Sequence, residues 1–168
     1  LGHLELCVIA EEIGRALAPI PFSSSVYLFT EAIIKYGSDE IKKNILPKLV
    51  TGEVVGTYAV AEDMTAITES TVSCNVEGDS VNGVKIAVPD AELATHAVVL
   101  AKGAKGSELR LVDLNSDGVE ISLQKNLDKS RAFYKVNFDN TQSSMLGDQG
   151  TGWESHVHIM DQAAVLFA

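Results

Sequence analysis

Three acidic side chains, Glu62, Asp63 and Glu69, follow an apolar run of small and β-branched residues. Two carboxylates held close together can act as a general acid and a general base when their surroundings separate their pKa values. Carboxylates at the end of a strand also commonly meet solvent or cap a turn. The sequence allows both roles, and we expect these carboxylates to meet solvent or cap a turn.

Histidine and cysteine spacing predicts neither a metal site nor an activated nucleophile. His156 and His158 are two residues apart on an expected helix, so they face different sides and make a poor metal pair. Cys7 and Cys74 lie far apart, and we expect buried, reduced thiols. His96 begins a strand-like run, where an edge or solvated position is expected. No serine or cysteine stands in a nucleophile-elbow context.

The glycine-rich stretch "GDQGTG" (residues 147–152) superficially resembles a phosphate-binding loop. It lacks the lysine and the Ser/Thr of a P-loop, and it does not follow a strand in a βαβ unit. We therefore expect a turn that leads into the N-terminus of a helix.

Composition restricts the possible partners. The 168 residues are 46% hydrophobic and carry a formal charge of -10, from 13 basic and 23 acidic side chains. Nucleic acid and anionic membranes would be repelled by such a surface, so neither is expected as a partner. The sequence has no apolar run long enough for a transmembrane helix and no recognisable signal peptide, and we expect a cytoplasmic protein.

Helical periodicity dominates the first third of the chain. Apolar residues at three- and four-residue steps predict a helix over residues 2–18, which the prolines at 19 and 21 end. Serines at 23–25 can cap a second helix that closes at Gly37. Ser38 can cap a third, which we expect to end at Pro47.

From Val54 onward, six to eight short β-branched runs alternate with turn signals, and "EGDSVNG" predicts a hairpin over residues 76–84. Helical pattern returns at about residue 152. The expected fold class is α+β. An N-terminal helical bundle (1–53) precedes an antiparallel β-sandwich or barrel-like middle domain (54–150) and the start of a C-terminal helical bundle (151–168). Both helical parts are expected to be truncated, because the chain starts and stops inside apolar periodicity.

Several motifs occur together in the order of one family. "YGSDEIKKNILPKLVTGEVVGTYAVAED" resembles the acyl-CoA dehydrogenase pattern G-s-x-e-q-k-x-x-x-L-P-x-L-x-x-G-e, followed by a strand ending in T-E. "VEGDSVNGVKIAVPDA" is similar to the hairpin of that family, and "LGDQGTGWESHVHIMDQAAVLFA" to the connector that opens its C-terminal domain. "AEEIGRALAPIPF" resembles the segment before them. The run from "VPDAELATHAVVLAK" to "FYKVNFDN" resembles a divergent bacterial branch, in which some members serve as partner subunits.

The resemblance implies a three-part subunit that binds FAD between the β domain and the helical bundles, at a subunit contact. A glutamate would remove the α proton of an acyl-CoA thioester while a hydride passes from Cβ to the flavin. In the family that glutamate lies beyond Ala168, so the resemblance implies no catalytic residue and no metal ligand in this chain. It also implies an electron-transfer flavoprotein or a similar electron acceptor, and a homo- or hetero-oligomer.

The resemblance also implies a set of cofactor-binding residues in two segments. The family strand Y-x-x-T-E matches "YAVAE", with alanine in place of threonine, and the family pattern W-I-T-N becomes "AVPD". The remaining hairpin residues, among them Lys85, are expected to build the hairpin. The implied cofactor-binding residues are Tyr58, Val60, Ala61, Glu62, Ala87, Val88 and Pro89.

Two alternatives follow. In "LDKSR", Asp128 and Arg131 are expected to form a structural ion pair, with a ligand role as the other possibility. The activity implied by the resemblance is oxidation of an acyl-CoA to the 2,3-enoyl-CoA. The competing hypothesis is a non-catalytic partner subunit, because Ala61, Ile67 and residues 87–89 have lost side chains that the family uses.

Overall fold

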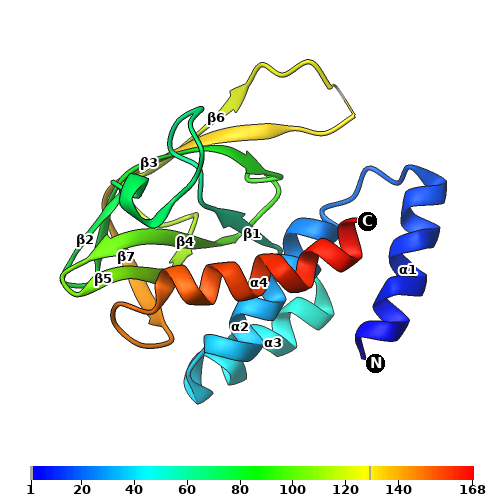
Figure 1. Cartoon of the computed structure of the whole chain (residues 1–168), viewed down its shortest axis with the longest axis horizontal. Helices are drawn as coiled ribbons and strands as arrows, with labels where there is room; N and C mark the ends of the chain where they lie inside the picture. The colour runs from blue at the N-terminus through cyan, green and yellow to red at the C-terminus, as the bar shows by residue number, and fades with distance from the viewer. Residues whose placement is uncertain (1, 129) are drawn as a thin grey trace.

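The computed structural model describes residues 2–128 and 130–168. Its helices lie on one side of a curved β-sheet (Figure 1). The N-terminal helices have the bounds α1 His3–Ala16, the π-wound segment η1 Ser23–Thr30, α2 Glu31–Tyr36 and α3 Asp39–Thr51. The Ser38 hydroxyl accepts a hydrogen bond from the Ile41 N–H at 3.2 Å, as predicted for an N-cap. Leu17 adopts a left-handed conformation (φ 48°) and ends α1 before the prolines.

Pro47 lies inside α3, so the predicted helix end at this residue is wrong. A proline removes one backbone donor, yet the helix continues for four more residues because its real stop signal is Gly52. Gly52 has a φ of 77° and donates its N–H to the Leu49 carbonyl at 3.3 Å. Val54 then donates to the Lys48 carbonyl at 3.1 Å, which directs the chain toward the sheet.

Seven strands form one sheet within the described residues, in the order β1-β4-β2-β3-β7-β5, with β6 on β7 and an added β4–β5 pairing. Most pairs are antiparallel, and β2 and β3 form the hairpin that the sequence predicts over residues 76–84, with Val76 paired to Val81. The pairings of β4 with β1 and with β2 are parallel, which the turn signals did not indicate. The strands are β1 Gly56–Ala59, β2 Asn75–Glu77, β3 Ser80–Pro89, β4 His96–Gly103, β5 Gly106–Asp113, β6 Val119–Gln124 and β7 Phe133–Leu146.

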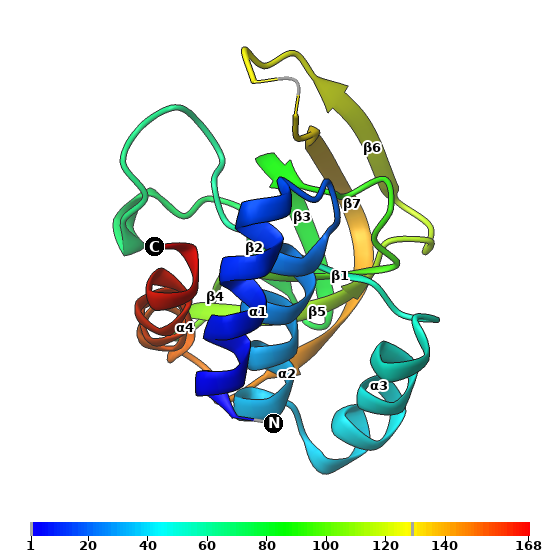
Figure 2. The ribbon, with the colours of Figure 1, turned by 90° about the vertical axis from the view of Figure 1, so that its right-hand side faces the viewer.

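The C-terminal helix α4 (Gly152–Phe167) lies against the sheet beside the N-terminal helices, as both views show (Figures 1 and 2). The expected α+β fold with a barrel-like middle sheet is therefore confirmed. One core fills the space between helices and sheet, where Phe29, Ile33 and Ile159 are fully buried. Gly56 is required there, because a Cβ on it would lie 2.0 Å from the Phe29 ring. The second core lies within the sheet.

None of the helices in the described residues has both the length and the apolar character needed to span a bilayer.

Candidate functional site

The ends of β1 and β3 lie against each other, although about 25 residues separate them in the sequence. Ile86 donates its N–H to the Ala61 carbonyl at 2.8 Å, and the Thr57 hydroxyl donates to the Pro89 carbonyl at 2.5 Å. The two segments implied by the resemblance therefore come together. We call the surface formed by Val60, Ala61, Ala87 and Pro89 the β1–β3 edge.

Glu62 ends the β1 segment with a fully engaged carboxylate. It accepts hydrogen bonds from the Ser73 N–H at 2.8 Å, from the Cys74 N–H at 3.0 Å and from Lys85 Nζ at 2.7 Å. The Ser73 hydroxyl also donates to it. Burial raises the pKa of Glu62, but the hydrogen bonds from Lys85 and Ser73 and the lysine charge outweigh it, so the net pKa is lowered. The carboxylate is held ionised and turned into the protein.

Lys85, the partner of Glu62, has a fully buried side chain. Its Nζ also donates to the Val60 carbonyl at 3.0 Å, so one ammonium group fixes both the segment that follows β1 and its own strand. Burial lowers the Lys85 pKa, and the neighbouring Cys74 and Glu62 oppose that shift. Burial likewise raises the pKa of the Cys74 thiol to about 11.

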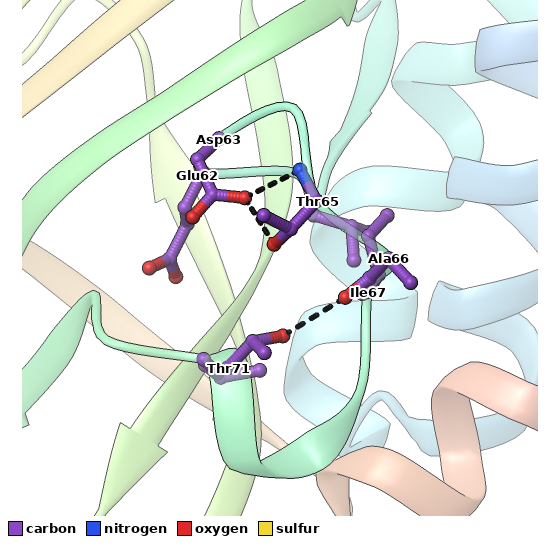
Figure 3. Close-up of a pocket in the computed structure, with 8 residues that line it drawn as sticks. Glu62, Asp63, Thr65, Ala66, Ile67 and Thr71 are labelled. Atoms are coloured by element: carbon purple, nitrogen blue, oxygen red, sulfur yellow. Dashed lines mark hydrogen bonds between the residues drawn. The ribbon is translucent and has the colours of Figure 1, made fainter.

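The carboxylates of the first acidic cluster do not pair with each other as acid and base. Asp63 accepts from the N–H and hydroxyl of Thr65 in a small pocket that the 62–72 loop forms (Figure 3). In the same loop the Thr71 hydroxyl donates to the Ala66 carbonyl at 3.4 Å. These interactions are those of an ordered turn.

Glu69, at the far end of this loop, accepts from the Ser107 hydroxyl at 2.9 Å. The same hydroxyl accepts the Trp153 N–H at 2.8 Å, at the start of α4. Ser107 therefore joins the acidic loop to the C-terminal helix, a link that sequence alone does not indicate.

Tyr58 and Val88 belong to the implied cofactor-binding set, but the structure buries both side chains, at 4% and 1% exposed. The Tyr58 hydroxyl lies 3.2 Å from His156 Nδ1, and the two rings stack with their centroids 5.8 Å apart. Burial lowers the pKa of His156 to about 4. Tyr58 thus joins β1 to α4 beneath the β1–β3 edge.

His158 lies 2.7 Å from Lys35 Nζ and is exposed, whereas His156 is buried against the sheet. The two histidines therefore face different sides of α4, as predicted. Among the described residues, no group of three or more potential ligands is arranged to hold a metal ion.

A bulge at Ala87 interrupts the pairing of β3 with β7. The register shifts between Lys85 and Val88, and Ala87 has a φ of 50°. Its N–H donates to Gln124 Oε1 at 2.6 Å, which brings the last residue of β6 to the β1–β3 edge. No local sequence pattern indicates this contact, because it joins residues 37 positions apart across an intervening strand.

The expected ion pair between Asp128 and Arg131 is wrong. Asp128 instead accepts from the Ser130 N–H at 2.8 Å, within a local turn. Arg131 reaches back to Asp90 at the end of β3, at 3.2 Å, where Asp90 also accepts from the Ser24 hydroxyl at 2.7 Å. Arg131 therefore has a structural role: its ion pair with Asp90 links the β6–β7 connection to the end of β3.

Comparisons with known proteins agree with this architecture. Residues 1–53 match the family model described as acyl-CoA dehydrogenase, N-terminal domain. The mitochondrial isovaleryl-CoA dehydrogenase of Solanum tuberosum is 32% identical over 77% of this chain, which corresponds to 34% of that protein. The structure of an acyl-CoA dehydrogenase from Geobacillus kaustophilus superposes with a TM-score of 0.86 at 22% identity, covering 96% of this chain and 47% of that one.

A glutaryl-CoA dehydrogenase from Mycobacterium smegmatis, solved in complex with FADH2, superposes with a TM-score of 0.75 at 23% identity, over 84% of this chain and 39% of that one. The chain spans less than half the length of each of these relatives. The family model covers the N-terminal helices (residues 1–53), and the two structural matches cover 96% and 84% of the chain. The chain therefore belongs to the acyl-CoA dehydrogenase family.

Proposed function

We propose that the protein carrying this chain is an FAD-dependent acyl-CoA dehydrogenase subunit, which oxidises an acyl-CoA thioester to the 2,3-enoyl-CoA. The main support for the proposal is that the ends of β1 and β3 meet at an apolar edge. The buried Lys85–Glu62 pair holds this edge in place. The proposal includes assembly into a homo- or hetero-oligomer and an electron-transfer flavoprotein, or a similar protein, as electron acceptor.

The chemistry of the β1–β3 edge fits one side of a planar, aromatic cofactor ring. Val60, Ala61 and Pro89 are partly exposed and Ala87 is exposed, so the edge offers apolar surface to a ligand. The Glu62 carboxylate does not place an unpaired negative charge next to the ring, because it accepts hydrogen bonds from Lys85 and from two backbone N–H groups. FAD, when bound, supplies the hydride-accepting chemistry.

The residues of this chain contribute positioning rather than proton transfer. Lys85 holds the Val60 carbonyl and the Glu62 carboxylate in place, and Tyr58 fixes β1 to α4 through His156. Glu62 is not the base that removes the α proton, because its proton-accepting oxygens are occupied and its pKa is lowered. The proposal assigns the base to no described residue.

A second candidate function, a non-catalytic partner subunit, is favoured by a specific feature of the edge. Ala61 and Pro89 carry no hydroxyl group, and Pro89 has no N–H. The Pro89 carbonyl is itself occupied by the Thr57 hydroxyl. Fewer side-chain hydrogen bonds are thus available to a ring than a threonine-bearing edge would offer.

The visible absorption spectrum of the purified protein, as its gene encodes it, separates the two candidates. The dehydrogenase should be yellow, carry FAD in stoichiometric amount, and lose its flavin absorption when an acyl-CoA is added without oxygen. A colourless protein that is inactive alone and active only with a second subunit would favour the partner-subunit function.

We also propose a reducing, cytosolic location, because Cys7 and Cys74 are both free thiols.

A further inference from the structure

Within the described part of the chain, Gln124 is the only residue whose side-chain amide forms a hydrogen bond at the β1–β3 edge. Its Oε1 lies 2.6 Å from the Ala87 nitrogen, at the bulge where β3 leaves the register of β7. β6 and β3 flank the same stretch of β7, because Gln124 pairs with Phe133 and Val88 pairs with Tyr134. The Gln124 side chain therefore spans β7 to reach the bulge.

The contact fixes which way the amide points. A backbone N–H can only donate, so Gln124 must present its carbonyl oxygen to Ala87. The Nε2 group shares the same rigid, planar amide and so lies in the same corner of the edge. Within the described residues no acceptor is bonded to Nε2, and the side chain is partly exposed. Two hydrogen-bond donors are thus available at an otherwise apolar surface.

We propose that Gln124 is a cofactor-site residue whose Nε2 donates a hydrogen bond to a carbonyl or ring nitrogen of the flavin. The inference rests on the proposed function and adds to it a donor from β6, a strand outside both implied cofactor segments. Ala61 and Pro89 cannot supply a side-chain donor, whereas the Gln124 amide is anchored beside them at Ala87. The anchoring bond lowers the entropic cost of presenting the donor, because the amide is already fixed.

The test compares FAD binding by the wild-type protein with binding by Gln124→Glu. The carboxylate of the variant still accepts the Ala87 N–H, so the bulge is retained, but it replaces the Nε2 donor with an acceptor. We expect the Kd of the variant for FAD to be about fivefold higher than that of the wild type or more, because one net hydrogen bond is lost. The flavin absorption bands should also shift. Flavin fluorescence titration of the deflavinated full-length protein gives the Kd.

Gln142→Glu is the matched control, because Gln142 is exposed on β7 and the charge change is the same. Its Kd for FAD should equal that of the wild type, and both variants should unfold at the wild-type temperature. If Gln124→Glu binds FAD with the wild-type Kd and spectrum, Gln124 only caps the bulge and the inference is overturned. A wild-type protein that binds no FAD would overturn the proposed function together with this inference, which distinguishes the two failures.

Discussion

Lys85 Nζ lies 2.7 Å from Glu62 Oε1, and the lysine side chain is fully buried while the glutamate side chain is 12% exposed. This pair joins β3 to the end of β1 and to the Ser73–Cys74 backbone. A buried charge without its partner is costly, so the two residues depend on each other. The pair holds in place the β1–β3 edge, where we propose that the cofactor binds.

Replacing Lys85 with methionine should destabilise the fold by about 3 kcal/mol, because it leaves a partly buried carboxylate without its cation. Urea unfolding followed by circular dichroism measures the change. Lys102→Met, on the exposed face of β4, is the control and should change stability by less than about 0.5 kcal/mol. The double variant Lys85→Met with Glu62→Leu should recover part of the loss. Wild-type stability in Lys85→Met would contradict the role of the pair.

Stability should fall as the pH drops from about 6.5 toward 4, because of His156. Burial lowers its pKa in the folded protein to about 4 from the ordinary histidine value of 6.5, so in this window the unfolded chain binds a proton that the folded chain does not. Each pKa unit of that difference corresponds to about 1.4 kcal/mol. The contribution of His156 to this loss should level off below about pH 4, where its imidazole is protonated in both states.

His156→Gln should weaken this pH dependence, whereas His158→Gln should keep it, because His158 is exposed on the other side of α4. Thermal unfolding at a series of pH values measures both variants. The same slope in the wild type and in His156→Gln would show that another group causes the acid sensitivity.

Local signals predicted the parts of the fold that local interactions determine. Ser38 caps α3 and "EGDS" forms the β2–β3 hairpin, because each signal acts within a few residues. The parallel β1–β4 pairing was not predictable, because it depends on contacts about 40 residues apart. The predicted helix end at Pro47 is wrong because one lost hydrogen bond is a weaker stop signal than the left-handed Gly52.

At the candidate site, resemblance identified both segments but not their chemistry. Lys85 falls on the inward side of β3 together with Val81, four residues earlier, so strand alternation could have shown its burial. No comparable signal exists for Gln124, because its contact crosses an intervening strand. Sequence spacing therefore locates the edge, and only the three-dimensional pairing shows which side chains are free at it.

Gly56→Ala should destabilise the protein by about 1–3 kcal/mol, because the new methyl group would lie 2.0 Å from the Phe29 ring. Gly14→Ala is the matched control: its new Cβ, in the last turn of α1, would meet nothing within 4 Å beyond its chain neighbours and the backbone of its own helix. That substitution should leave the stability unchanged or raise it by about 0.5–1 kcal/mol, since glycine is a poor helix former. Equal effects of the two substitutions in chemical denaturation would contradict the close packing of η1 on β1.

Glu62→Gln tests whether this carboxylate takes part in proton transfer. A base that removes the α proton contributes about 10²–10⁴-fold to the rate. Because Glu62 is held by Lys85 and by two backbone N–H groups, we expect the variant to keep solvent exchange of the acyl-CoA α proton to within about tenfold. Nuclear magnetic resonance of an acyl-CoA in deuterated buffer, with the full-length holoenzyme, measures the exchange. Lys85→Met should cause a loss of similar size if both residues only position the edge. A loss of a hundredfold or more in Glu62→Gln alone would identify Glu62 as the base and overturn our assignment.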